Sequence, residues 1–396
     1  QYYVLSTTPG GRILGQALLR KVYQIAARYE FYSTNQEVLP ILKAMSTGMT
    51  RVSQYNYWEK CIRKNERAKA AYQNAFDLFN RYQELTKYQG KLSSQKQILF
   101  LEEAISTLSA DFRETGSPTC AYFCGVLQTA LYEQQGQFNK AIATCKSLIE
   151  LLRNNVSIRQ TQRLAFQYSN IAIMEFQLGR LAEALGYLDL SIASTTPGSL
   201  DEYHKLRQKV EILFYQGAYI DAQKLNSRIQ SAQKTIGEVD YAITRVVEAV
   251  IYFKQGEFRQ ALLILNQKFA LSTDKAGWEL TVRILTVMTL GELGKPEQAE
   301  KSFHNLDRYV HRNYKEHAVT LRDKEIIKLL RELVRCGFIF AEISQRAIDI
   351  GTKLSTSSDT EWKYGTPELI PVDEWFLKKI KKKPISPNYQ GLCPFH

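Results

Sequence analysis

The feature that most constrains how this chain can fold is a short pattern that recurs five times among its 396 residues. Each copy has a glycine, then an apolar residue or a proline two positions later, then an alanine three positions further on. The copies begin at Gly136, Gly179, Gly217, Gly256 and Gly294. Successive glycines therefore lie 43, 38, 39 and 38 residues apart. Such a regular period is typical of repeat architectures and is not expected of unrelated surface loops.

The copy within Tyr241 to Gln267 indicates what each position does. Apolar residues recur at helical spacing on both sides of Gly256, which predicts two helices joined by a turn. The glycine ends the first helix, because a left-handed or closely approached backbone costs least without a β-carbon. The small Ala261 lets the second helix approach the first closely. One pair cannot bury its apolar stripe alone, so we expect neighbouring pairs to stack.

The other copies fill the same positions. The predicted contact alanines are Ala141, Ala184, Ala222, Ala261 and Ala299, and the predicted turn-covering residues are Phe138, Leu181, Tyr219 and Phe258. In the fifth copy Pro296 stands at the turn-covering position.

On these residues, the stretch from about Tyr122 to Tyr309 resembles the tetratricopeptide repeat (TPR) family. The resemblance implies an all-α fold, an α-solenoid of helix-turn-helix repeats with a concave groove lined by the first helix of each pair. The family period of about 34 residues is shorter than the period found here. Its aromatic residue near the start of the first helix is present only as Tyr168. Longer helices or loops are therefore expected.

The segments around the repeats complete the predicted organisation. The expected regions are residues 1–117, an N-terminal helical region that can include a degenerate repeat; residues 118–311, five TPR-like repeats; residues 312–354, capping helices; and residues 355–396, a tail with a short basic amphipathic element. Within the first region we expect helices from about Arg12, from Ser53 to Tyr88 and from Ser94 to Asp111. A polar outer face is expected for the cap, formed by Arg322, Asp323, Lys324, Arg331 and Arg335.

The composition suits a folded, basic protein. Apolar residues make up 44% and charged residues 23% of the chain, which is enough to bury a core. A formal net charge of +12 favours acidic partners, although a modest excess spread over many helices is also common in proteins that bind no nucleic acid. Six cysteines in so long a chain do not make a disulfide framework, which favours a reducing compartment and a cytoplasmic location.

The sequence contains no predicted membrane or export signal. No apolar run approaches the roughly 20 residues that span a bilayer. The amino end lacks the apolar core of a signal peptide. Because residue 1 is Gln and not Met, residues upstream of Gln1 can have been removed.

The residues that most often carry catalysis or bind metals form no convincing constellation. Cys120 and Cys124 could present two thiolates, but no second pair lies nearby and small buried side chains are favoured. The terminal Cys393 and His396 form an isolated CxxH, and no serine lies in a GxSxG elbow. Surface positions are favoured for the loosely clustered His304, His311 and His317. We therefore predict no enzyme activity, no cofactor and no metal site.

The concave groove is the predicted working surface. The resemblance places there Phe123, Gln134, Phe166, Asn170, Gln177, His204, Arg207, Glu211, Phe214, Val250, Phe253 and Lys254. Aromatic and aliphatic residues suit an apolar or helical peptide, whose acidic groups would meet Arg207 and Lys254. An alternative to peptide binding carries the same weight. In it, these side chains pack the helices together, or the N-terminal helices or the tail fill the groove.

Two basic stretches suggest a different partner. They comprise Lys60, Arg63, Lys64 and Arg67 on one helix face, and Lys378, Lys379, Lys381, Lys382 and Lys383 near the end of the chain. The first could contact phosphate or an acidic partner, and the second could contact nucleic acid or an anionic membrane surface. A solvated helix face is favoured for the first, and a helix end whose cations complement the dipole is favoured for the second.

The favoured function is a non-catalytic protein–protein interaction module or scaffold that binds a peptide or helix in its groove. Helices ahead of long repeats also resemble the layout of bacterial Rap-type quorum-sensing regulators, which makes a peptide-sensing regulator an alternative. Nucleic-acid binding through the two basic stretches is a third hypothesis. The sequence does not predict the oligomeric state.

Overall fold

The computed structural model describes residues 11–46, 52–87, 94–271, 277–313 and 319–381. Within these ranges the regular structure is helical throughout, with no β-strand. None of the helices in these ranges is both long and apolar enough to cross a membrane. The chain divides into two compact units, one ending at Thr195 and the other beginning at Thr196. The four regions expected from the sequence stay a prediction.

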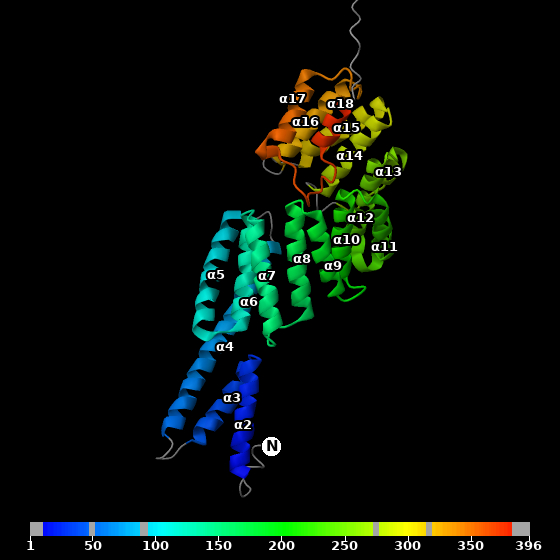
Figure 1. The fold of residues 1–396 in the computed structure, drawn as a ribbon. Coiled ribbons are helices and arrows are strands. Elements are labelled where there is room, and N and C mark those ends of the chain that lie inside the picture. Colours follow the sequence, from blue (N-terminus) through cyan, green and yellow to red (C-terminus); the bar gives the residue numbers. More distant parts are fainter. Residues whose placement is uncertain (1–10, 47–51, 88–93, 272–276, 314–318, 382–396) are drawn as a thin grey trace, which may run out of the picture. The chain divides into compact units, whose positions relative to one another are not determined.

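The first unit consists of helices that pack against their neighbours in the chain (Figure 1). These are α2 (Gly11–Arg28), α3 (Tyr32–Ala44), α4 (Val52–Lys87), α5 (Ser94–Thr115), α6 (Pro118–Gln134), α7 (Phe138–Asn154), α8 (Thr161–Gln177) and α9 (Leu181–Ala193). Two of the predicted helix pairs, α6 with α7 and α8 with α9, lie in this unit.

The second unit continues the pairs. Its helices are α10 (Leu200–Tyr215), α11 (Tyr219–Ser231), α12 (Gln233–Gln255), α13 (Phe258–Leu265), α14 (Trp278–Glu292), α15 (Pro296–Asn313), α16 (Leu321–Arg335), α17 (Gln345–Thr356) and α18 (Val372–Lys381), with a 3₁₀ turn η1 (Ser358–Thr360). The first helices α10, α12, α14 and α16 also contact one another in sequence, so they form one face of this unit. We call it the inner face.

The turns of the repeats adopt the predicted backbone. All five repeat glycines are left-handed, with φ from 63° at Gly294 to 84° at Gly256. At Gly256 the glycine N–H donates to the carbonyl of Phe253 (3.1 Å), and the next N–H donates to the carbonyl of Tyr252 (2.9 Å). These bonds satisfy the last carbonyls of the first helix in a Schellman motif. The prediction of a left-handed glycine turn is confirmed.

The contact alanines are completely buried. Ala141, Ala184, Ala222, Ala261 and Ala299 each have 0% of their surface exposed. Turn-covering rings pack back onto the first helix of their own pair, as Phe258 does on Phe253, with ring centroids 5.2 Å apart. Together these features confirm a TPR-like repeat fold.

The pairs differ from one another where the sequence departs from the pattern. Helix α12 is broken at Gly237, which has φ 80° and ψ 174°, and α13 has only 8 residues. After α16 another left-handed glycine, Gly337, is followed by left-handed Phe338. The Phe338 ring occupies the space that a β-carbon on Gly291 would fill, at 2.3 Å. The capping pair therefore has a longer turn, and α17 begins only at Gln345.

The N-terminal helices are attached to the repeats through a buried carboxylate. Glu30, 8% exposed, follows α2 and accepts a hydrogen bond from Thr119 Oγ1 at 2.6 Å and another from the Ser117 hydroxyl. Ser117 is the N-cap of α6. Negative charge is stabilised at a helix N-terminus, so Glu30 links the two parts of this unit favourably.

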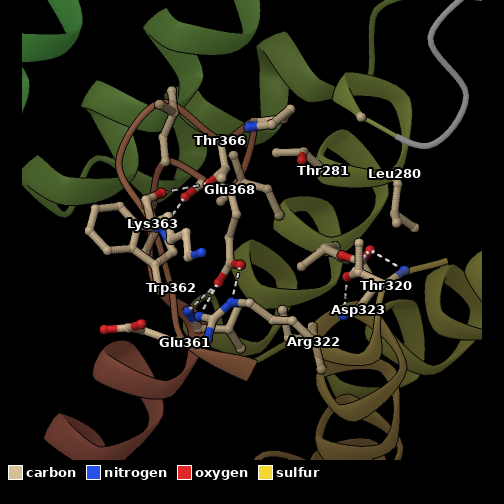
Figure 2. A pocket seen from close by; sticks show the side chains of 18 of the residues that line it. Leu280, Thr281, Thr320, Arg322, Asp323, Glu361, Trp362, Lys363, Thr366 and Glu368 are labelled. Carbon is tan, nitrogen blue, oxygen red and sulfur yellow. Dashed lines mark hydrogen bonds and ion pairs between the residues drawn. The ribbon is translucent and has the colours of Figure 1, made fainter. Parts of the chain in front are cut away.

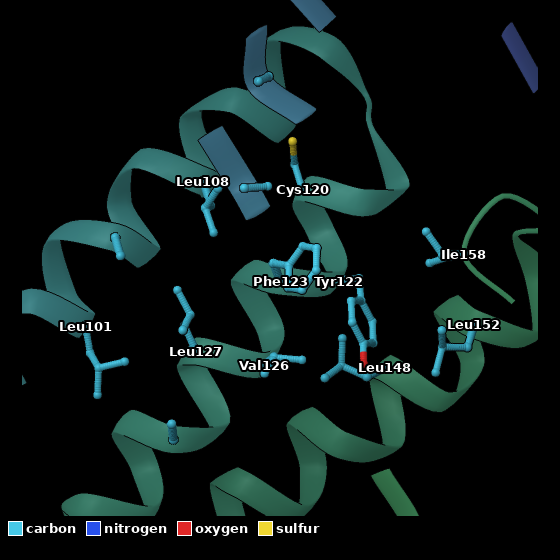
Figure 3. Close-up of a cluster of buried hydrophobic side chains, with 14 residues drawn as sticks. Leu101, Leu108, Cys120, Tyr122, Phe123, Val126, Leu127, Leu148, Leu152 and Ile158 are labelled. Atoms are coloured by element: carbon cyan, nitrogen blue, oxygen red, sulfur yellow. The ribbon is translucent and has the colours of Figure 1, made fainter. Parts of the chain in front are cut away.

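A cluster of buried apolar side chains joins α4, α5, α6 and α7 (Figure 3). Phe123 belongs to this cluster, with its ring centroid 4.8 Å from those of both Phe76 and Phe79 on α4. Cys120 lies in it with no exposed surface, as expected for a small core residue. Cys124 is half-buried, with its sulfur 3.2 Å from Ser109 Oγ.

The repeat alanines give a direct test of the packing. Replacing Ala261 by Leu inserts a larger side chain where no space is left, and we expect a loss of about 1–3 kcal/mol in the free energy of unfolding. Leu263 on the same helix is 66% exposed, so Leu263→Ala should change stability by less than about 0.5 kcal/mol. Urea unfolding followed by circular dichroism measures both. Equal stability of the two variants would contradict the predicted helix contact.

Candidate functional site

The inner face of the second unit is covered by a segment of the same chain. The connection between α17 and α18, Ser357 to Pro371, crosses it and shares two hollows with the first helices. We call it the crossing segment. Two of its apolar residues, Leu369 and Ile370, are only 2% and 5% exposed. The segment is therefore packed into the unit like core, although it has little regular secondary structure.

Arg322 on α16 is the main anchor of the crossing segment. Its Nε and Nη2 donate to the two carboxylate oxygens of Glu368 at 2.6 and 2.7 Å. Nη2 also donates to Asp373 at 2.5 Å, and Nη1 donates to the Thr360 carbonyl at 2.6 Å. A forked guanidinium suits such a paired contact. Burial raises the pKa of the Glu368 carboxyl, although the charge of Arg322 opposes this.

Glu292 forms a second anchor at the end of α14. Its carboxylate accepts hydrogen bonds from Trp375 Nε1 and Lys379 Nζ, both at 2.6 Å. Phe376 between them along α18 is fully buried, and its ring lies 2.5 Å from the position of a β-carbon on Gly351. Helix α18 is thus held against α14 and α17 at both its polar and its apolar side chains.

Beneath the crossing segment lies an apolar cavity of about 360 Å³ (Figure 2). Its walls include Leu280, Ile284 and Met288 from α14 and Ile326 from α16. Figure 2 shows Glu368 extending from the crossing segment to Arg322. Trp362 lies to the left of Glu368 in this view, and Leu280 lies to its right. Trp362 donates to the Glu368 carbonyl at 2.8 Å, which fixes the indole over the cavity.

A second hollow, about 780 Å³ in volume, lies between α10, α12 and α18. We call it the aromatic–lysine hollow. Its lining includes Phe214, Tyr215, Tyr219, Lys254, Trp362, Tyr364, Glu374, Leu377, Lys378 and Lys381. The Tyr215 ring contacts Trp362 and Tyr364, with centroids 5.4 and 5.1 Å apart. The hollow therefore combines an aromatic wall with three lysines.

Residues predicted to line the groove in the second unit fall into four environments. His204 and Arg207 both contact Asp240 of their own unit, at 3.3 and 2.5 Å. Phe253 is a buried packing residue. Val250 faces the apolar cavity. Lys254 reaches the aromatic–lysine hollow, together with the 3%-exposed Phe214.

In the first unit the predicted residues separate into core and surface. Phe123 lies in the core cluster described above. Gln134 donates to Gln97 on α5 at 3.2 Å. Phe166 is 45% exposed, and Asn170 and Gln177 are half-buried. The last three follow helical spacing, so they share one face of α8.

The basic stretches contain paired and exposed cations. Lys60 and Lys64 are exposed on α4, whereas Arg63 lies 3.4 Å from Glu59 and Arg67 lies 2.9 Å from Glu114. Near the end of the chain Lys379 binds Glu292, and both Lys378 and Lys381 line the aromatic–lysine hollow. The predicted Lys382, Lys383, Cys393 and His396, together with His317, lie outside the described residues.

One sequence expectation is wrong at the cap. Arg322 was expected on a polar outer face, but it is 9% exposed and binds the crossing segment. No sequence pattern indicated a role for Glu368, Trp362 or Tyr215. The apolar run from Leu369 to Val372, within a segment otherwise like a loop, is the signal that could have indicated a buried connection.

Removing the Arg322 guanidinium should destabilise the second unit. Arg322→Met leaves Glu368 and Asp373 without their cation, and an uncompensated buried charge costs about 3–5 kcal/mol. Arg346 is 68% exposed and 3.8 Å from Glu332, so Arg346→Met should cost no more than about 1 kcal/mol. Urea unfolding at neutral pH compares them. The triple variant that adds Glu368→Gln and Asp373→Asn should recover part of the loss; no recovery would refute the buried-charge explanation.

Glu211 on α10 should make stability depend on pH. Burial raises its pKa from 4.5 to about 7, although Arg207 one turn away opposes the shift. Because the folded state binds the proton more tightly than the unfolded state, the free energy of unfolding should fall as pH rises from about 4.5 to about 7. Glu211→Gln should flatten this dependence, as measured by melting temperature at pH 5 and pH 8. The exposed Glu238→Gln should keep the wild-type dependence, and identical curves for all three proteins would contradict the assignment.

Comparisons with known proteins find similarity among solved structures alone. No family model matches, and no curated protein gives a significant match. A tetratricopeptide repeat protein from Parabacteroides merdae is 15% identical, covering 78% of this chain and 99% of that one, with a TM-score of 0.47. The apo form of the quorum sensor NprR from B. thuringiensis is also 15% identical, covering 81% and 91%, with a TM-score of 0.47.

The apo form of RapI is 12% identical over 92% of this chain and 97% of its own, with a TM-score of 0.46. Likenesses at this level carry no conclusion about partners. The repeat fold rests on the glycine turns and buried alanines of this chain itself.

Proposed function

We propose that this chain is a non-catalytic interaction protein that binds polypeptide segments on the first helices of its repeats. The observation that carries the proposal is the crossing segment, because the inner face of the second unit already holds a largely irregular stretch of polypeptide. Arg322 binds a backbone carbonyl and a carboxylate of that stretch, and Tyr215 contacts its aromatic rings. These are the interactions that a foreign peptide would also use.

In the first unit the corresponding surface is accessible. Phe166 is 45% exposed on α8, and Asn170 and Gln177 continue the same face one and three turns further. A ring offers apolar contact area, and side-chain amides can bind the backbone of an extended peptide through both donor and acceptor. We place the binding of a partner peptide on this face of α8.

The alternatives have less support from the contacts. Nucleic-acid binding would use the basic face of α4, where Arg63 and Arg67 already contact carboxylates. Lys379 likewise holds α18 to Glu292. A peptide-sensing regulator would use the same inner surfaces as an interaction module and differs in its response to the peptide, so it is a special case of the proposed function.

Affinity purification tests the α8 face. The double variant Phe166→Ala and Asn170→Ala should lose partners that copurify with the wild type, while its melting temperature stays within about 2 °C, because substitutions at accessible positions cost little stability. Leu190→Ala is the matched control, since Leu190 is a 49%-exposed apolar residue of α9 in the same unit. Mass spectrometry compares the recovered proteins. Full recovery by the double variant would refute binding on this face.

A further inference from the structure

The aromatic–lysine hollow brings together residues that are far apart in the sequence. Lys254 comes from α12, Lys378 and Lys381 come from α18, and the rings of Tyr215 and Tyr364 come from α10 and the crossing segment. All of them belong to the second unit. A volume of about 780 Å³ lies within the range of ligand-binding pockets and exceeds what a single small ion needs.

The charge of the hollow is unbalanced. Among the residues that the structure describes, three lysines line it, against the carboxylates of Asp373 and Glu374. Asp373 is bound to the Arg322 guanidinium at 2.5 Å and shares it with Glu368, so its charge is compensated in part. Glu374 is exposed at the first turn of α18. The lining therefore carries a net positive charge that favours an anionic ligand.

The positive charge of Lys254 is unfavourable in the folded chain. It is half-buried, and burial lowers the pKa of its ammonium group, with Lys378 adding to the effect and Glu374 opposing it. A cation out of water is stabilised when a carboxylate is placed beside it. An incoming anion would supply that partner.

The walls indicate what must accompany the anion. On one side the ring of Phe214 contacts those of Tyr215 and Tyr219, with centroids 5.2 and 5.6 Å apart. Trp362 and Tyr364 extend the aromatic surface from the crossing segment. Such rings offer apolar contact, so the ligand should carry apolar side chains between its charges.

We propose that the aromatic–lysine hollow binds an acidic segment of a protein partner. One carboxylate pairs with Lys254, further carboxylates pair with Lys378 and Lys381 at α18, and an apolar side chain packs on Tyr215 and Tyr219. This assignment rests on the proposed function, because it requires that the chain binds polypeptides. Beyond the proposed function, it specifies a second contact area for the partner and states that the segment bound there is acidic.

Fluorescence polarisation with the full chain tests the assignment. The probe is a labelled five-residue peptide with four glutamates around one phenylalanine, and the matched probe replaces every glutamate by glutamine. We expect the acidic probe to bind and the glutamine probe not to bind. The affinity of the acidic probe should fall as the salt concentration is raised, because salt screens the charges of exposed lysines. Lys254→Met should weaken binding at least about tenfold, since a charge-assisted contact is lost.

A second measurement separates binding from folding. Lys254→Met removes a half-buried charge without shortening the side chain, so its melting temperature should equal or exceed that of the wild type. Lys224→Met is the control, because Lys224 is 75% exposed on α11 and does not line the hollow. This control should bind the acidic probe as the wild type does.

Three results would overturn the assignment: no binding of the acidic probe, equal binding by Lys254→Met, or displacement of the probe by millimolar inorganic phosphate, which would indicate a site for small anions. The double variant at Phe166 and Asn170 should still bind the acidic probe, because those residues lie in the other unit. If that variant loses copurifying partners while the probe never binds, the assignment of the hollow fails and the proposed function stands.

Discussion

The close contact between the two helices of each pair is the constraint on which the rest of the structure depends. A left-handed glycine reverses the chain within one turn, as at Gly256, and a buried alanine such as Ala261 lets the helices meet without a gap. Neither residue has a side chain that could bind a partner. Their role is to bring the longer apolar residues of adjacent helices into one continuous core.

Within the second unit, one buried guanidinium holds the crossing segment and α18 in place. Arg322 collects two carboxylates and a backbone carbonyl from residues up to 51 positions away in the sequence. A charge this well buried is stable because its partners surround it. The crossing segment is consequently part of the inner face, and it divides that face into the apolar cavity and the aromatic–lysine hollow.

The repeat pattern predicted helices far better than it predicted which of their side chains are accessible. Phe123, Phe166 and Phe214 all lie on first helices, yet two are buried and Phe166 is 45% exposed. The difference arises from neighbours: α4 covers Phe123, whereas Phe214 packs with Tyr215 and Tyr219. Helical periodicity gives the direction of a side chain but contains no information on what another element places against it.

The sequence by itself determined the helix pairs, their turns and their buried alanines, because these depend on residues within about 40 positions of one another. The tertiary structure alone decided that Arg322 is an anchor and not a surface charge, and that Lys254 and Lys378 meet in one hollow. Arg322 and Glu368 are more than 40 positions apart, and Lys254 and Lys378 are more than 120 positions apart. No local sequence pattern specifies contacts over such separations. Long-range packing therefore made the candidate site from residues that the sequence had assigned to separate features.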